Sequence, residues 1–198
     1  MSDILELSPD AQNLLFREAR TANAFTDEPV TDEQIAAIYD LMKFAPTAMN
    51  TQPLRIVLVR HGDPRERLLK HMADGNRDKT ANAPLVAILA ADTGFHDHLP
   101  RTFPHFPGAR DLFGDDASRE QAAKFNATLQ AGYFFLGVRA AGLAAGPMNG
   151  FDAEGIDRDF FAGTNLRSLV VVNLGKPAEN AWFDRLPRLE HDEVVLEA

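Results

Sequence analysis

The sequence contains no cysteine among its 198 residues. Disulfide bonds, thiolate metal ligands and cysteine nucleophiles are therefore excluded, and any redox chemistry needs a bound cofactor. Positive charge is also scarce: 20 Lys and Arg stand against 29 Asp and Glu, which gives a formal net charge of −9. A chain with this charge is not expected to bind nucleic acid or an anionic membrane outside a local basic site.

Long apolar runs and low-complexity tracts are absent as well. No run reaches the roughly 18 residues of a membrane span, and the acidic start, Met1-Ser2-Asp3-Ile4-Leu5-Glu6, does not resemble a signal or transit peptide. We therefore expect a cytoplasmic protein with no membrane partner. An apolar content of 45% is typical of a globular chain, and the even spread of glycine and proline favours a single domain over residues 1–198.

Helical and strand patterns follow one another in irregular order. Apolar spacing, capping residues and glycines predict helices over about 10–19, from a Thr31–Gln34 capping box to Ala45-Pro46, from Asp63 to Gly75, over 118–141 and after Asp152. Runs of β-branched and apolar residues predict strands over 54–60, 83–91 and 168–174. Because helices outnumber strands and do not alternate with them regularly, we expect an α+β fold.

Three segments carry more specific expectations. Leu14 and Leu15 would anchor the first helix in the core. Residues 93–118 would form a long irregular insertion that lines or covers a site. The 118–141 helix is apolar around most of its circumference, which predicts a place at the centre of the molecule or at a subunit interface.

Several catalytic signatures are missing. The chain has no Gly-x-Gly-x-x-Gly, no Walker loop, no Gly-x-Ser-x-Gly and no His-Glu-x-x-His, so Rossmann-type binding and P-loop phosphoryl transfer are not expected. His96 and His98, with His105 nearby, could hold a metal if the first two shared the face of a strand. A polar loop is the alternative interpretation, and we expect no metal site.

Four segments could bind a ligand. The loop Ala45-Pro46-Thr47-Ala48-Met49-Asn50-Thr51-Gln52-Pro53-Leu54-Arg55 lies between a predicted helix and strand, and its amides suit the edge of a neutral heterocycle. Arg20-Thr21-Ala22-Asn23 could bind an anion. The small residues of 142–152 would let the backbone approach a flat ligand, and Arg185-Leu186-Pro187-Arg188 is basic in an acidic chain. The alternatives are a capping turn, surface arginines and an ordinary turn-rich loop.

In order along the chain, these features resemble the nitroreductase family of FMN-dependent oxidoreductases. The family's Arg-Ser pair, Phe and Pro-Val stand here as Arg20-Thr21, Phe25 and Pro29-Val30, and its Ala-Pro-Ser-x-x-Asn-x-Gln-Pro-x-Arg motif matches 45–55. The glycine-rich turn before Gly150-Phe151-Asp152 and the ending 173–177 also match. Residues 19–21, 75–80, 146–152 and 185–189 look most similar to the malonic semialdehyde reductase branch.

The resemblance implies a central, mostly antiparallel sheet flanked by helices, and a homodimer with an extended C-terminal segment and FMN at the subunit interface. It implies NAD(P)H as co-substrate. Many relatives carry a second Arg where this chain has Asn23. The resemblance implies three sets of FMN-binding residues. The FMN phosphate would be held by Arg20, Thr21, Asn23 and Arg185 or Arg188. The ribityl chain and the ring edge would be bound by the loop residues Pro46, Thr47, Asn50 and Gln52, and the flavin ring would lie by Pro147, Met148 and Gly150.

The reaction that the resemblance implies is reduction of malonic semialdehyde to 3-hydroxypropanoate, a step of pyrimidine catabolism. A broad-specificity nitroaromatic or quinone reductase and a flavin-binding protein without turnover are the alternatives. A small carboxylate substrate would need a cation nearby, for which Arg101, Arg110 and Lys79 are candidates. No general acid is evident in the motifs, so water or His105 would supply the proton.

Overall fold

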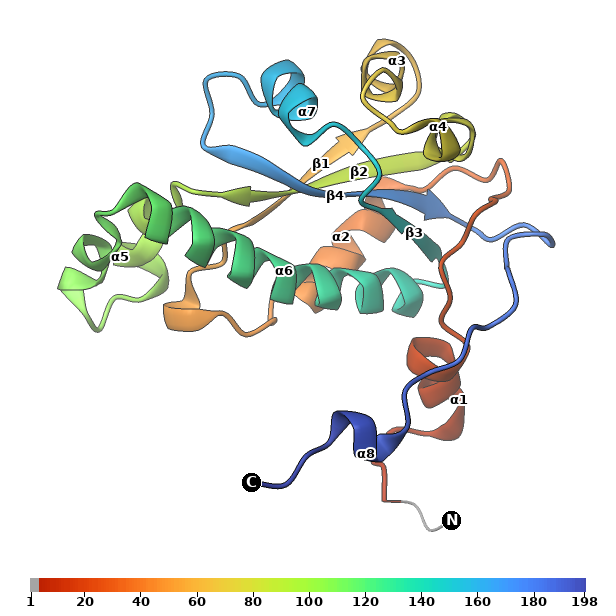
Figure 1. The fold of residues 1–198 in the computed structure, drawn as a ribbon, viewed down its shortest axis with the longest axis horizontal. Coiled ribbons are helices and arrows are strands. Elements are labelled where there is room, and N and C mark those ends of the chain that lie inside the picture. Colours follow the sequence, from red (N-terminus) through yellow and green to blue (C-terminus); the bar gives the residue numbers. More distant parts are fainter. Residues whose placement is uncertain (1–3) are drawn as a thin grey trace.

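A computed structural model describes residues 4–198, and the first three residues of the acidic start lie outside it. Its centre is an antiparallel four-stranded sheet with strand order β1-β2-β4-β3 (Figure 1). The strands are β1 (Leu54–Val59), β2 (Leu85–Asp92), β3 (Ala144–Met148) and β4 (Leu166–Gly175). This arrangement confirms the predicted α+β class with an antiparallel sheet.

Helices cover both faces of the sheet (Figure 1). Helices α2 (Asp32–Met42) and α6 (Asp116–Ala140) pack on one face, and α3 (Asp63–Leu69), α4 (Asp74–Ala81) and α7 (Ala153–Phe160) lie over the other. The short helices α1 (Pro9–Gln12) and α8 (His191–Val194) lie below α6, where the two chain ends also come (Figure 1). Helix α5 (Leu99–Thr102) belongs to the predicted insertion.

The sheet separates two hydrophobic cores, and β2 contributes to both. Leu85 and Leu89 pack with α2 and α6, while Val86 and Ile88 pack with α3 and α7. Every residue of β2 is buried, because a strand alternates its side chains between two covered faces. This explains the continuous apolar run that predicted the strand.

Local capping signals place the helix starts correctly. Thr31 Oγ1 accepts a hydrogen bond from the Gln34 amide at 3.2 Å, and Gln34 Oε1 accepts one from the Thr31 amide at 2.9 Å. Asp152 accepts a hydrogen bond from the Gly155 amide at 3.0 Å and begins α7 as predicted. These caps satisfy amides that the first helical turn leaves without partners.

Two predictions of secondary structure are wrong. Residues 144–148 form β3 and not a loop; the segment lacks β-branched residues, and its pairing with β4 overrides this local preference. The helix predicted from Asp63 to Gly75 is two helices, with Gly62 at the first N-cap and Gly75 inside α4. The chain reverses between them because the Ala73 amide donates to the Gly150 carbonyl at 3.0 Å.

The chain's first helix and the insertion also differ from expectation. Residues 13–17 form a π-helical turn. Leu14 is 40% exposed and Leu15 is only partly buried, so neither residue is the predicted core anchor. The insertion is built of short helical turns, with 3₁₀ turns at Phe95–His98 and Pro107–Phe113 on either side of α5. None of the helices within residues 4–198 combines the length and hydrophobicity needed to cross a membrane.

Candidate functional site

Five of the predicted site residues meet at one concavity of about 190 Å³. Arg20, Thr21 and Asn23 line it from the N-terminal segment, and Arg185 and Arg188 line it from the C-terminal segment. Three arginines and a threonine, together with one acidic residue, Asp184, therefore line one concavity, although more than 160 residues separate the two segments. Such a set of donors suits a dianion such as a phosphate monoester.

Backbone pairing holds this arginine cluster against the sheet. The Ala22 amide donates to the Ala145 carbonyl and the Asn23 amide donates to the Ala181 carbonyl, both at 3.0 Å. Beside this contact, Gly146 has no room for a side chain, because a Cβ atom there would lie 2.4 Å from the Ala22 carbonyl oxygen. The two segments thus converge on β3 through close backbone contacts.

Helix α4 links the arginine cluster to the turn at Gly150. Asn76 Nδ2 donates to the Gly150 carbonyl at 3.0 Å, and Lys79, one helical turn later, donates to Asn23 Oδ1 at 3.5 Å. Sequence reasoning offered Lys79 as a partner for a substrate carboxylate and assigned Asn76 no role. The spacing of three residues between Asn76 and Lys79 could have indicated a shared role, because it places both side chains on one face of a helix.

Pro147 and Met148 line a different concavity, of about 580 Å³, together with α6 residues such as Thr128 and Phe135. The Met148 side chain is buried, and its sulfur accepts hydrogen bonds from Thr80 Oγ1 at 3.6 Å and Asn173 Nδ2 at 3.8 Å. These contacts fix the end of β3 on the α4 side of the sheet.

The loop between α2 and β1 has an uncommon backbone conformation. Met49, Asn50 and Gln52 have φ angles of 50°, 50° and 44°, a left-handed region that side chains other than glycine rarely adopt. Each such residue costs on the order of 1–3 kcal/mol unless its surroundings fix it, and such strain gathers at binding sites. Two of the three strained residues, Asn50 and Gln52, are among those that the family resemblance implied for flavin binding.

Buried amides of α6 hold this loop in place. Asn126 Oδ1 accepts from the Ala48 amide at 2.8 Å, and Gln130 Oε1 accepts from the Leu54 amide at 2.9 Å. Thr47 contributes its hydroxyl, which accepts from the Gln52 amide at 3.2 Å. Both α6 side chains are less than 5% exposed, so sequence patterning alone would have assigned neither of these polar residues to the core.

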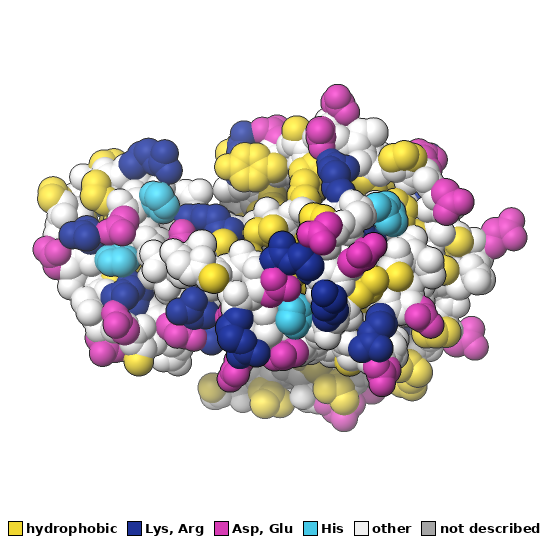
Figure 2. Space-filling view, turned by 90° about the horizontal axis from the view of Figure 1, so that it is seen from above, with side chains coloured by type: hydrophobic (Ala, Val, Ile, Leu, Met, Phe, Trp, Pro, Cys, Tyr) yellow, Lys and Arg dark blue, Asp and Glu magenta, His cyan; other side chains and the backbone are white. Residues whose placement is uncertain are grey.

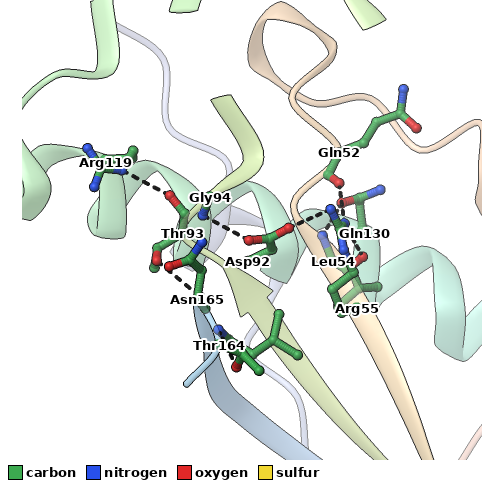
Figure 3. A network of polar contacts seen from close by, with 11 residues as sticks. Gln52, Leu54, Arg55, Asp92, Thr93, Gly94, Arg119, Gln130, Thr164 and Asn165 are labelled. Atoms are coloured by element: carbon green, nitrogen blue, oxygen red, sulfur yellow. Dashed lines mark hydrogen bonds and ion pairs between the residues drawn. The ribbon is translucent and has the colours of Figure 1, made fainter. Parts of the chain in front are cut away.

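The side chains of the loop are also bonded to one another. Gln52 Nε2 donates to Asn50 Oδ1 and Asn50 Nδ2 donates to the Thr102 carbonyl, both at 2.8 Å. Arg55 donates to the Gln52 carbonyl at 3.0 Å and forms an ion pair with Asp92 at 2.6 Å (Figure 3). Pro46 is exposed at the start of the loop.

Within one chain, the predicted site residues are not gathered into a single cavity. The arginine cluster, the end of β3 and Gln52 each line a separate concavity, and no described residue lines two of the three. The motif residues within residues 4–198 therefore lie at three separate concavities, which are candidate partial sites.

The histidine segment is not a strand. Residues 95–98 form a 3₁₀ turn, Asp97 is paired with Arg110 at 2.8 Å, and the His105 ring packs on Phe103 with centroids 3.9 Å apart. The Arg110 guanidinium lowers the pKa of the Asp97 carboxyl. Across residues 4–198, no group of three or more His, Cys, Asp or Glu side chains is arranged to hold a metal ion.

Comparison with known proteins identifies relatives along almost the whole chain. A Streptomyces griseus protein that carries the name "Putative NADH dehydrogenase/NAD(P)H nitroreductase" is 65% identical over 192 residues, which are 96% of this chain and 97% of that protein. A relative of the same name from Leptothrix cholodnii is 49% identical and covers 92% of this chain and 93% of its own length.

Solved structures show the same fold at low sequence identity. An Exiguobacterium sibiricum protein solved in complex with FMN superimposes with a TM-score of 0.83 at 16% identity and covers 98% of this chain and 99% of its own. Residues 16–176 match the Nitroreductase family. The chain therefore belongs to the nitroreductase family.

Proposed function

We propose that this protein is an FMN-dependent NAD(P)H oxidoreductase. The observation that carries the proposal is the convergence of Arg20, Arg185 and Arg188 with the Thr21 hydroxyl on one concavity. In a chain of net charge −9, this local cluster of cations fits the terminal phosphate of FMN better than an extended polyanion. The FMN complex of the Exiguobacterium protein and the relatives' NAD(P)H nitroreductase names support the same assignment.

The residues present fit the flavin in other respects. Asn23 removes one positive charge relative to the family pattern, and Lys79, which reaches Asn23 Oδ1, restores a cation at the same place. Gly150 stands where a Cβ atom would lie 2.6 Å from Asn76 Nδ2, so the turn stays narrow and its backbone amides are accessible. Asn50 and Gln52 present paired donors and acceptors of the kind a flavin pyrimidine edge requires.

Bound FMN would supply hydride transfer between NAD(P)H and an electron acceptor. The protein's residues bind and orient: the arginine cluster holds the phosphate, and the strained 49–52 loop presents its amides in a conformation that folding has already imposed. Backbone amides near Gly150 would stabilise negative charge that develops on the reduced ring. Water is the simplest proton source, because His105 packs on Phe103.

We further propose a homodimer in which a second chain completes each site. Phe125, Leu129 and Tyr133 form an apolar stripe on α6, with exposed fractions of 65%, 42% and 42%. Beyond β4, Leu186 and Leu189 are also exposed. The opposite face, over α3, α4 and α7, carries interspersed charges of both signs (Figure 2). An interface at the α6 stripe would bring the partial sites of two chains together.

For the acceptor, we propose malonic semialdehyde, reduced to 3-hydroxypropanoate in pyrimidine catabolism, on the basis of the motif similarity over residues 19–21, 75–80, 146–152 and 185–189. The nitroreductase names of the relatives support the alternative of a broad nitroaromatic or quinone reductase. The cytoplasmic location and the organisation of residues 1–198 as one FMN-binding domain stay predictions.

Anaerobic flavin spectroscopy tests the proposal. Protein loaded with FMN and desalted should show a flavin band near roughly 450 nm that NADH or NADPH bleaches and malonic semialdehyde restores. Product analysis should then identify 3-hydroxypropanoate. Restoration by quinones or nitro compounds alone would favour the broad reductase. A bound flavin that neither nicotinamide bleaches would leave a flavin-binding protein without turnover.

A further inference from the structure

A second group of basic side chains, apart from the arginine cluster, surrounds a cavity of about 510 Å³. The cavity lies between the end of α2, residues 51–56 and α5. Lys43, Arg55, His98 and Arg101 line it, and its lining contains no Asp or Glu. In a chain of net charge −9, the wall of this cavity is thus unusual in carrying basic side chains and no acidic one.

Only one of these strongly basic side chains has no partner among residues 4–198. Arg55 is paired with Asp92 and Lys43 with Asp40. For Arg101, no ion pair or side-chain hydrogen bond occurs within residues 4–198. The other two cations considered for a carboxylate are engaged elsewhere: Arg110 binds Asp97, and Lys79 reaches Asn23.

A second polar group of the cavity wall also lacks a partner. Thr51 is 2% exposed, and its buried hydroxyl makes no hydrogen bond to any described residue. A buried hydroxyl without a partner costs free energy unless a ligand or a water molecule satisfies it. Met42, Leu54 and Ile56 supply an apolar part of the same wall. The lining thus combines a free cation, an unsatisfied hydroxyl and a short apolar surface.

From this we infer that the cavity binds the carboxylate end of a small monocarboxylate electron acceptor, with Arg101 as the residue that selects for the charge. The inference rests on the proposed function and extends it to the cavity and the residue that hold the acceptor's carboxylate. Gln52 belongs both to the cavity wall and to the strained loop of the candidate flavin site. An acceptor whose carboxylate is held at Arg101 would therefore keep its reducible group close to that loop.

Two nitro compounds that differ by one carboxylate group test the inference. The ratio of kcat/KM for 4-nitrobenzoate to kcat/KM for nitrobenzene should fall about tenfold or more in Arg101→Gln. Arg110→Gln is the matched control, because it removes another exposed guanidinium of the same insertion that is already paired with Asp97. Arg101→Lys should recover part of the ratio, since it keeps the charge but not the bidentate geometry.

Calorimetric titration of 4-nitrobenzoate into the oxidised protein gives a readout independent of turnover. Arg101→Gln should weaken binding about tenfold or more, and Thr51→Val, which keeps the shape but not the hydroxyl, should weaken it by a smaller factor. An unchanged charge selectivity together with unchanged binding in Arg101→Gln would overturn the inference. If no nicotinamide reduces the flavin, the proposed function fails, while the titration still decides whether the cavity binds the carboxylate.

Discussion

Arg55 and Asp92 join β1 to the last residue of β2 through an ion pair of 2.6 Å, and the same guanidinium donates to the Gln52 carbonyl at 3.0 Å. Asp92 also accepts a hydrogen bond from the Gly94 amide at 2.8 Å. The pair therefore ties the strained loop on one side to the start of the insertion on the other (Figure 3). The side chains are 32% and 12% exposed, so solvent screens the pair only partly.

Asp92→Asn should lower the free energy of unfolding by about 1–3 kcal/mol, because it removes the charge while the guanidinium stays half-buried. Urea unfolding followed by circular dichroism measures the change. Asp40→Asn is the control: that carboxylate is 70% exposed in its pair with Lys43, and its loss should cost at most about 0.5 kcal/mol. Equal losses in the two variants would contradict the structural role given to Asp92.

Arg20→Ala should weaken FMN binding about tenfold or more, while riboflavin, which lacks the phosphate, should bind nearly as before. Quenching of flavin fluorescence gives both dissociation constants. Arg17→Ala removes a guanidinium three residues earlier that does not line the concavity, and it should alter neither constant. If Arg20→Ala weakened riboflavin and FMN by the same factor, the cluster would not be a phosphate site.

Gly146→Ala should destabilise the fold by about 1–3 kcal/mol and weaken FMN binding, because the new methyl group would press on the Ala22 carbonyl beside Thr21. Thermal unfolding and flavin titration follow the two effects. Gly75→Ala provides the contrast, since a Cβ atom there meets nothing within 4 Å and should add about 0.5–1 kcal/mol to the stability of α4. A neutral Gly146→Ala would contradict the close contact.

Asp159 should make the stability pH-dependent in acid. A hydrogen bond from Arg67, and a second contact with His71 at 3.1 Å, lower the pKa of this carboxyl in the folded state. Its stabilisation is thus complete above the unfolded value of about 3.9 and is lost as the pH falls through the lower folded value.

Urea midpoints measured between pH 7 and pH 3 test this expectation. Asp159→Asn should unfold at lower urea than the parent protein at neutral pH, and the gap should close as the pH falls below about 4. Asp74→Asn, whose carboxylate is 93% exposed, should show little gap at any pH. A gap for Asp159→Asn that does not change with pH would mean that the ion pairs with Arg67 and His71 are unimportant.

Phe125→Glu should convert the proposed dimer into monomers, because it places a charge at the most exposed residue of the apolar stripe on α6. Sedimentation velocity measures the mass in solution. Arg158→Glu makes a charge change on α7, on the opposite face, and should leave the mass unchanged. A parent protein that already sediments as a monomer at high concentration would refute the proposed homodimer.

Features encoded by neighbouring residues were predictable from the sequence. The Thr31–Gln34 cap and the apolar run of β2 each depend on a few adjacent side chains, and the structure confirms both. Segment 144–148 was missed because its strand conformation comes from pairing with β4 and not from its own residues. The split between α3 and α4 was missed for a similar reason, since contacts with Gly150 set the reversal.

The candidate site also combines features that local motifs predict with features that depend on distant parts of the chain. The motifs located the arginines and the 45–55 loop, but no spacing rule could place Arg185 beside Arg17 and Ala19, whose carbonyls accept its hydrogen bonds. The left-handed conformation of Met49 and Gln52 also had no local signal, because these residue types seldom adopt it. Support from Asn126 and Gln130, far along the chain, makes it possible.

The arginine cluster combines an early segment, residues 20–23, with a late one, residues 183–188, and this has a consequence for synthesis on the ribosome. The sheet is complete once Gly175 has emerged, but Arg20 gains its partner segment only when residues 183–188 follow. A nascent chain can therefore fold its core before it can bind a phosphate through the full cluster. A message cut short within this last stretch would encode the complete sheet but only part of the anion site.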